Sequence, residues 1–241
     1  MKTVAISQPM YFPWLGLFEQ LHLADEFIFF DNVQYARGFI NRVQYKTASG
    51  TSWLTVPLCK HGRNTLILDL QSAEKNEWRK KHLRALSISL SGAPYAKDAI
   101  ELSESVLLRS ELSFSDMLIE SILAIGSYFD LLEGKVFHRS SNLPIAGYKS
   151  DLVQNLVTHL DGDRYITGLG AMDYLDHSAF ESTGIDVCYM NYQKKEYPQK
   201  FYPFTPYVTA LDLVANCGPS GRDFINSGVI SWQEALTKYK D

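Results

Sequence analysis

The side chains that could move a proton or hold an anion in this chain are few. Asp31 ends the hydrophobic run EFIFF, where a carboxylate could orient a hydroxyl, hold a magnesium ion or act as a base. Lys81 and His82 close the basic segment WRKKH, in which the imidazole could donate a proton or contact phosphate. Asn41 and Arg42 stand together, and arginine offers a bidentate fork to an anion. We therefore predict Asp31, Lys81 and His82 as catalytic residues.

Each of these residues also has a structural interpretation. An aspartate at the end of a strand is a common turn former, so Asp31 could be structural. Arg42 could pair with a surface carboxylate. The segment around His82 could be a solvated basic face of a helix, on which Trp78 would neighbour Lys81 and His82. Both interpretations stay open from the sequence alone.

The segment QPMYFPWLG, which follows the first predicted strand, differs from an ordinary connecting loop. Such loops are usually built of glycine, serine, asparagine and aspartate, whereas this one contains two prolines and three aromatic residues. We expect Pro9 and Pro13 to stiffen the chain. Tyr11 and Trp14 would form a wall for a flat or sugar-like ligand, with Gln8 beside them. The alternative is that the aromatic residues only cover the end of the sheet.

The segment TGLGAMDYL is not a dinucleotide-binding fingerprint, because Asp173 takes the third glycine position of GxGxxG. Gly168 and Gly170 could let the backbone approach a ligand, or make a tight turn before a helix at Asp173. Asp212 and Asn216 are four residues apart and would share a helix face, as ligands or as caps and buried network members. No P-loop, GxSxG or kinase signature is present. The complete predicted substrate-binding set is Gln8, Tyr11, Trp14, Gln34, Asn41, Arg42, Gly168, Gly170, Tyr174, Gln199, Asp212 and Asn216.

The elements that must position these residues follow an α/β pattern. Short apolar segments alternate with helical patterns, which is typical of a mostly parallel sheet. Each predicted strand is followed by a polar or glycine-bearing stretch, and the carboxyl ends of parallel strands share one edge. We predict an α/β fold with a mostly parallel open sheet of about five strands flanked by helices, nucleotidyltransferase- or Rossmann-like. The predicted strands are Val4–Ser7, Glu26–Phe30, Lys135–Arg139, Arg164–Thr167 and Ile185–Asn191.

A β-hairpin and a helical block are inserted into this frame. Val43/Tyr45 and Trp53/Thr55 alternate on either side of an Ala-Ser-Gly turn, which predicts the hairpin. We see no repeat, low-complexity tract or linker, so we expect a single α/β domain over residues 1–241. Helices are predicted at Trp14–Leu23, at Asn76–Leu90, after Pro94, from Ser113 or Ser115, at Lys149–Leu160 and in the tail, where Ser231 and Glu234 form a capping box.

Composition excludes several classes of function. The formal net charge is -4 and the 23 basic residues are dispersed, which argues against nucleic acid as a partner. No apolar run approaches the roughly 18 residues that span a bilayer, and no signal pattern opens the chain, so we expect a cytoplasmic protein without a membrane span. Three scattered cysteines and six histidines without HxH or HExxH predict no disulfide and no structural metal. The sequence identifies neither a cofactor nor an oligomeric state.

Several segments together carry a resemblance to a known family. QPMYFPWLGLFEQLHLADEFIFFDNVQYARGFINR resembles the opening of the WbqC-like family. WRKKH before APY, YITGLGAMDYL and YPQKFYPFTPYVTALDLVANCG match further along, in order. These are small bacterial proteins associated with surface-polysaccharide gene clusters. The resemblance therefore implies work on a nucleotide-activated amino sugar or a lipopolysaccharide precursor, and it supplies no proven catalytic residue.

The resemblance and the polar rim together predict a transferase of O-antigen or surface-polysaccharide biosynthesis. It would transfer a group, such as an acyl or aminoacyl unit, to a nucleotide-linked or phosphorylated amino sugar, with Arg42 and Lys81 neutralising phosphate. The alternative is a non-catalytic module that binds a glycan precursor or a partner enzyme. Asp31 or His82 in a deep cleft beside Arg42 would favour catalysis, and scattered positions would favour binding.

A further alternative is a degenerate nucleotidyltransferase-like protein that binds a nucleotide. The opening strand, loop and helix are similar in shape to adenylyl-transferring nucleotidyltransferases and pantothenate-synthetase-like ligases, whose HxGH histidines stabilise phosphate. This chain has Trp14 and Leu17 at the corresponding places. Ordinary adenylyl transfer is therefore disfavoured.

Overall fold

The computed structural model describes residues 1–75 and 77–239, and its centre is a six-stranded sheet. The strand order is β5-β2-β1-β6-β7-β8, in which the first five strands run parallel and the last pair is antiparallel. A separate antiparallel hairpin, β3-β4, lies apart from the sheet. The strands are β1 (Thr3–Ser7), β2 (Glu26–Phe29), β3 (Arg42–Thr47), β4 (Gly50–Thr55), β5 (Val136–Arg139), β6 (Arg164–Thr167), β7 (Asp186–Asn191) and β8 (Gly228–Ser231).

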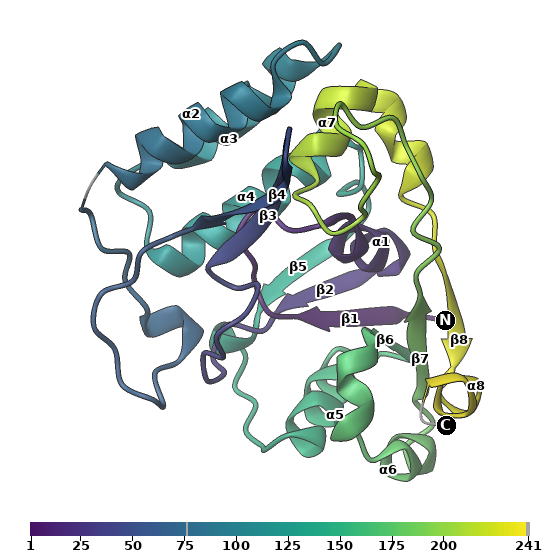
Figure 1. The fold of residues 1–241 in the computed structure, drawn as a ribbon. Coiled ribbons are helices and arrows are strands. Elements are labelled where there is room, and N and C mark those ends of the chain that lie inside the picture. Colours follow the sequence, from purple (N-terminus) through teal and green to yellow (C-terminus); the bar gives the residue numbers. More distant parts are fainter. Residues whose placement is uncertain (76, 240–241) are drawn as a thin grey trace.

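Helices cover both faces of the sheet (Figure 1), with α1, α4 and α7 on one side and α5 and α6 on the other. Short 3-10 turns connect several elements. The α-helices are α1 (Leu15–Leu23), α2 (Trp78–Leu90), α3 (Ala96–Leu107), α4 (Phe114–Tyr128), α5 (Ser150–His159), α6 (His177–Ser182), α7 (Leu211–Cys217) and α8 (Trp232–Tyr239). The 3-10 turns are η1 (Ile67–Asp69), η2 (Ser140–Asn142), η3 (Leu169–Asp173) and η4 (Gly218–Phe224).

Alternation along the central strands divides the core into two layers. Ala5, Phe27 and Phe29 join a cluster with α1, α4 and α7, whereas Val4 and Ile28 join a second cluster with α5 and α6. Successive side chains of a strand point to opposite faces, so a strand apolar at every position must be buried on both sides. The near-continuous apolar runs of β1 and β2 therefore predict the three-layer arrangement that the structure shows.

The predicted fold class is confirmed, with differences at the edges. The sheet has a sixth strand, β8, which the sequence analysis missed because four residues, GVIS, are too few to show a period. The helix predicted at Asp173 is the end of η3, and α6 begins at His177 after the cap Asp176. Asn76, the predicted first residue of α2, lies outside the described residues, and the described helix begins at Trp78.

The predicted caps are present. The Ser113 hydroxyl accepts a hydrogen bond from the Asp116 amide at 3.1 Å and thereby starts α4. At α8, the Glu234 amide donates to Ser231 Oγ and the Ser231 amide donates to the Glu234 carboxylate, both at 3.2 Å. That exchange is a capping box, and it marks the point where the chain leaves β8 and turns into helix.

Candidate functional site

A cavity of about 940 Å³ lies at the carboxyl edge of the parallel strands. Its lining comes from the segments that follow β1, β2, β6 and β7, and from the start of α5. We call it the switch-point cavity, because successive strands are added on one side of β1 up to β5 and on the other side from β6 onward. Open α/β sheets bind ligands at this reversal. Its lining includes Ser7, Gln8, Trp14, Gln34, Tyr148, Lys149, Thr167, Gly168, Gly170, Tyr174 and Tyr192.

The loop after β1 divides its side chains between this cavity and the core. Gln8, Met10 and Trp14 line the cavity. Tyr11 and Phe12 are fully buried in the core, so for these two the interpretation as packing holds. The Phe12 amide donates to the Ser121 hydroxyl at 3.0 Å, which holds its backbone at a φ of 39°. The aromatic residues of this loop thus both line the cavity and fill the core.

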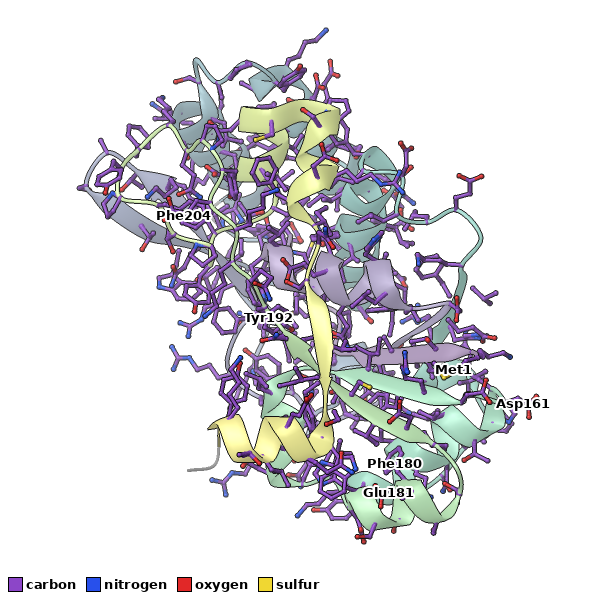
Figure 2. The ribbon with its side chains drawn as sticks, turned by 90° about the vertical axis from the view of Figure 1, so that its right-hand side faces the viewer. Met1, Asp161, Phe180, Glu181, Tyr192 and Phe204 are labelled. Atoms are coloured by element: carbon purple, nitrogen blue, oxygen red, sulfur yellow. The ribbon has the colours of Figure 1, made fainter. Side chains whose placement is uncertain are left out.

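Aromatic side chains form one wall of the cavity. The Trp14 ring centroid is 5.0 Å from that of Tyr192 and 5.6 Å from that of Tyr207. Figure 2 shows Tyr192 between the sheet and the loop that carries Phe204. Burial raises the pKa of the Tyr192 hydroxyl, and the charge of Glu19 raises it further, so this tyrosine is a neutral hydrogen-bonding group at physiological pH. The wall offers flat apolar surface with a few hydroxyls.

Gly16 makes room for the Trp14 indole. A Cβ atom at Gly16 would overlap three ring carbons of Trp14. Overpacking a seated side chain costs about 1 to 3 kcal/mol, which exceeds the gain of about 1 kcal/mol from replacing glycine by alanine in a helix. The glycine in WLG is thus explained by the tryptophan two residues before it.

Gly16→Ala is therefore expected to lower the free energy of unfolding by about 1 kcal/mol net. In a Trp14→Ala background the same substitution should be neutral or stabilising, because only the helix preference is left. Urea denaturation of the single and double variants measures both values. Equal destabilisation in the two backgrounds would show that the indole does not occupy this place.

Gly168 and Gly170 bring bare backbone to the cavity. Gly168 has extended angles, φ -77° and ψ 162°, so its conformation does not require glycine. A Cβ there would lie 3.5 Å from the Tyr192 hydroxyl, and a Cβ at Gly170 would meet nothing within 4 Å. Packing within the chain does not demand glycine at either place, and the bare backbone leaves room for close approach of another molecule.

Lys149 and the start of α5 supply positive charge. The lysine lines the cavity directly before Ser150, the first residue of α5, whose first-turn amides have no acceptor within the helix. Its backbone lies at φ 49° and ψ -119°, a conformation that costs a non-glycine residue about 1 to 3 kcal/mol. Asp151, in the first turn, does not line the cavity. An anionic group could therefore contact Lys149 and the helix start together.

Sequence reasoning missed Lys149 and Tyr148 as site residues. The signal was present, since Tyr148 precedes and Lys149 opens a predicted helix that follows a strand, and helix starts gather at this edge of the sheet. Gly147 also belongs to this segment, and a Cβ there would meet Leu152 backbone atoms at 2.8 Å. The tight approach at Gly147 fixes the path of the chain into α5.

Asp31 lies outside the cavity, within a buried hydrogen-bond network. Its carboxylate accepts from Arg139 Nε at 2.8 Å, from the Ser140 and Ser141 hydroxyls at 3.1 and 2.9 Å, and from the Ser141 amide at 3.0 Å. Arg139 also pairs with Asp116. Four donors occupy the acceptor sites of the carboxylate, which argues against a role as general base. The hydrogen bonds of Asp31 connect the end of β2 to the end of β5.

His82 and Lys81 do not line the cavity either. His82 is buried, with Nδ1 2.8 Å from the Tyr11 hydroxyl. Burial lowers the pKa of His82 from 6.5 to about 4, against the opposing effect of a hydrogen bond to the Thr55 backbone. The Tyr11–His82 pair therefore joins the β1–α1 loop to α2 in the neutral state. Lys81 is exposed and lines a different hollow.

Asn41 and Arg42 hold the base of the hairpin. The Asn41 side chain donates to the Val56 carbonyl at 3.0 Å and accepts from the Tyr35 hydroxyl at 2.9 Å. Arg42 Nε donates to the Gly38 carbonyl at 3.1 Å, and its guanidinium lies 4.3 Å from the Trp53 ring centroid. Neither residue lines the cavity.

Gln199, Asp212 and Asn216 take part in local packing. Gln199 bonds both ways with Thr205 in its own loop, and Asn216 donates to the Asp212 carbonyl one turn earlier in α7. The buried Asp212 carboxylate accepts from the Tyr197 hydroxyl at 3.1 Å. Burial raises the pKa of Asp212 to about 6, against the opposing effects of Tyr197, Lys46 and Gln199. For Asp212 and Asn216 the network interpretation fits the geometry.

Four residues of the predicted site, Tyr11, Asp31, Arg42 and Gly168, do not share one cavity, because only Gly168 lines it. Tyr11 and Asp31 point into the core, and Arg42 lies on the hairpin. No aspartate, glutamate, histidine or cysteine is among the described residues of the lining. The members of the predicted set that the structure does bring together are Gln8, Trp14, Gln34, Gly168, Gly170 and Tyr174.

No metal centre or membrane helix is found in the part of the chain that the structure describes. Within residues 1–75 and 77–239, no three acidic, histidine or cysteine side chains lie close enough together to hold a metal ion. Across those same ranges, no helix combines the length and apolar character needed to cross a bilayer.

Comparison with known proteins agrees with the order of the sequence motifs. The model of the WbqC-like protein family matches residues 8–224, a range that includes most of the cavity lining. The uncharacterised protein Rv1507c of Mycobacterium tuberculosis is 31% identical over 228 residues, which cover 93% of this chain and 98% of that protein. No solved structure matches the chain. The chain belongs to the WbqC-like protein family.

Proposed function

We propose that this protein binds a nucleotide-linked or phosphorylated amino sugar in the switch-point cavity and transfers a group to it, as a step in surface-polysaccharide biosynthesis. The observation that carries the proposal is the cavity itself, at the strand-order reversal where α/β sheets bind nucleotides. Its volume of about 940 Å³ lies at the upper end of the range for small-molecule sites. The polysaccharide context comes from the family resemblance.

The lining matches the parts of such a ligand. The Trp14–Tyr192 wall suits the face of a base or a sugar ring. Gln8 and Gln34 offer amides to hydroxyl groups. Lys149 and the start of α5 suit a phosphate, which could lie close to the backbone at Gly168.

Group transfer in this cavity would rest on positioning and on neutralisation of phosphate charge. The described lining residues include no carboxylate or imidazole to serve as an acid or base. Holding two reacting groups in a productive geometry can by itself supply several kcal/mol of the activation barrier. The strained Lys149 backbone favours a chemical role, since strain of this kind gathers at functional sites.

A non-catalytic binding module is the second candidate. It is favoured by the same lack of acid and base groups among the described lining residues, and by the hydrogen bonds that occupy Asp31 and His82 outside the lining. Mass spectrometry of the bound sugar after incubation with acyl-CoA separates the two. A mass gain of one acyl group marks a transferase, and an unchanged ligand favours the module.

A thermal-shift screen tests the ligand. UDP-sugars, dTDP-sugars, ATP and CTP are each added to the protein. A nucleotide sugar at about 100 times its Kd is expected to raise the Tm by roughly 5 to 10 °C, because a ligand that binds only the folded state stabilises it. No shift with any nucleotide sugar would contradict the proposal. A shift with ATP or CTP alone would favour the degenerate nucleotidyltransferase.

Gly168→Val locates the binding. The extended backbone of Gly168 suits a β-branched residue, and the new side chain would occupy the cavity near Tyr192. We expect an unchanged Tm without ligand and an affinity lower by at least about tenfold, a loss of about 1.4 kcal/mol. Gly228→Val is the matched control, because a Cβ there meets nothing within 4 Å and Gly228 does not line the cavity. Equal affinities of the two variants would place the ligand elsewhere.

A further inference from the structure

A second hollow, of about 360 Å³, lies between the tip of the β3–β4 hairpin and α2. Its floor is fixed by the buried Ser89 hydroxyl, which donates to the Lys46 carbonyl at 2.6 Å and so ties α2 to β3. Phe201 closes one side. No residue of this hollow lines the switch-point cavity, so it is a separate site.

The charge of the second hollow has one sign. Lys46, Lys81 and Arg84 line it, and no acidic residue is among the described lining residues, although the whole chain has a net charge of -4. Lys81 and Arg84 are exposed and have no ion pair among the described residues. Three cations around one hollow of an acidic protein, two of them exposed and without an ion pair among the described residues, indicate an anionic partner.

Lys46 is the most informative of the three, because the residue is only 3% exposed. Its ammonium group donates to the Pro203 carbonyl. An ammonium group has three donors, and among the described residues the Pro203 carbonyl is the one hydrogen-bond acceptor of Lys46, so this group has donors to spare for a ligand. Burial lowers the pKa of Lys46, while the charge of Asp212 opposes that shift. An anionic oxygen in the hollow would supply what this group lacks.

The walls between these cations are apolar. Ile88 is 64% exposed on the face of α2 that bears Arg84 and Ala85, and Phe201 also lines the hollow. An isoleucine this exposed beside two free cations has an apolar surface for a ligand to cover. A small inorganic anion would use the cations and leave Ile88 in water. An uncharged apolar molecule would cover Ile88 and leave Lys46 unsatisfied.

We propose that the second hollow binds an anionic amphiphile, a molecule with one carboxylate or phosphate head on an apolar chain. The head contacts Lys46, Lys81 and Arg84, and the chain lies along Ala85, Ile88 and Phe201. Fatty acids and alkyl or isoprenoid phosphates share this chemistry. The site is independent of the ligand proposed for the switch-point cavity.

Isothermal titration of the full chain tests this site with four probes: decanoate, decyl phosphate, decanol and inorganic phosphate. We expect decanoate or decyl phosphate to bind with a Kd below about 1 mM. Decanol, which has only the chain, and inorganic phosphate, which has only the charge, should bind at least about tenfold more weakly. If decanoate binds more tightly than decyl phosphate, the preferred head group is a carboxylate, and the reverse order identifies a phosphate. Inorganic phosphate or decanol binding as tightly as the amphiphiles would overturn the proposal, as would no binding by either amphiphile.

Charge variants confirm the place. Lys81→Gln/Arg84→Gln should weaken amphiphile binding at least about tenfold, because charge-assisted hydrogen bonds are lost. Lys80→Gln/Lys97→Gln removes the same charge from exposed helix positions outside the hollow and should leave the affinity unchanged. Gly168→Val should also bind the amphiphile normally. If both double variants weaken amphiphile binding equally, the effect comes from the net charge of the protein, and the proposed site is overturned.

Discussion

Replacing Asp31 with alanine is expected to lower the free energy of unfolding by about 3 kcal/mol, the usual cost of breaking a buried ion pair. The substitution removes the acceptor for Arg139, for two serine hydroxyls and for the Ser141 amide. Asp31 is fully buried, so water cannot take over its hydrogen bonds without a rearrangement of the chain. Ligand affinity in the switch-point cavity is expected to persist while the protein is folded.

Urea denaturation measures this effect, with Asp223→Ala as the matched control. Asp223 is exposed and has no ion pair among the described residues, so its removal should change stability by less than about 0.5 kcal/mol. An Asp31→Ala variant that is as stable as the wild type but has lost group transfer would restore Asp31 as a catalytic base. It would also contradict the tie between β2 and β5.

The second large effect is a pH-dependent contribution of His82 to stability. Its pKa is lowered by burial from 6.5 to about 4, so the unfolded chain binds one more proton than the folded chain between these two values. The stabilisation is complete above pH 6.5 and is lost as the pH falls toward 4. The shift corresponds to about 3 kcal/mol across the window. The difference in the free energy of unfolding between the wild type and His82→Gln, measured at each pH, isolates the contribution of His82.

This difference between the two proteins is needed because buried carboxyls with raised pKa values change the stability with pH in the opposite direction to His82. Burial raises the pKa of Asp212 to about 6 and also raises that of Glu19, so these groups stabilise the fold as the pH falls. The slope of the wild type therefore contains terms of opposite sign. Between pH 6.5 and 4, His82→Gln should lose less stability than the wild type, and Asp212→Asn should lose more. Identical slopes in the wild type and His82→Gln would show that the imidazole titrates normally.

The layered sheet could be predicted because its signals are local. The apolar runs of β1 and β2, the stripe of α5 and the caps at Ser113 and Ser231 each act within one element. Strand ends share an edge by the geometry of parallel sheets, and this rule was enough to bring Gln8, Trp14 and Gly168 to one cavity.

The direction of single side chains could not be predicted in this way. Asp31 and Asn32 are neighbours, yet Asn32 lines the cavity and Asp31 points into the protein. What holds Asp31 inside is Arg139, whose Nε donates to the Asp31 carboxylate at 2.8 Å across 108 positions of sequence. The direction of the Tyr11 side chain is likewise set by its hydrogen bond to His82, 71 positions away. Partners this distant leave no local pattern, and a strand shifted by one residue reverses every orientation.

The most direct test of the central claim is amide and indole NMR of the protein during titration with the nucleotide sugar that gives the largest thermal shift. We predict that the changes concentrate at Trp14, Gly168, Gly170 and the start of α5, with none at Lys81 or Arg84. They should weaken in Gly168→Val. Changes that gather around His82, Arg42 or the hairpin, with the Gly168 and Gly170 amides unmoved, would contradict binding at the strand-order reversal.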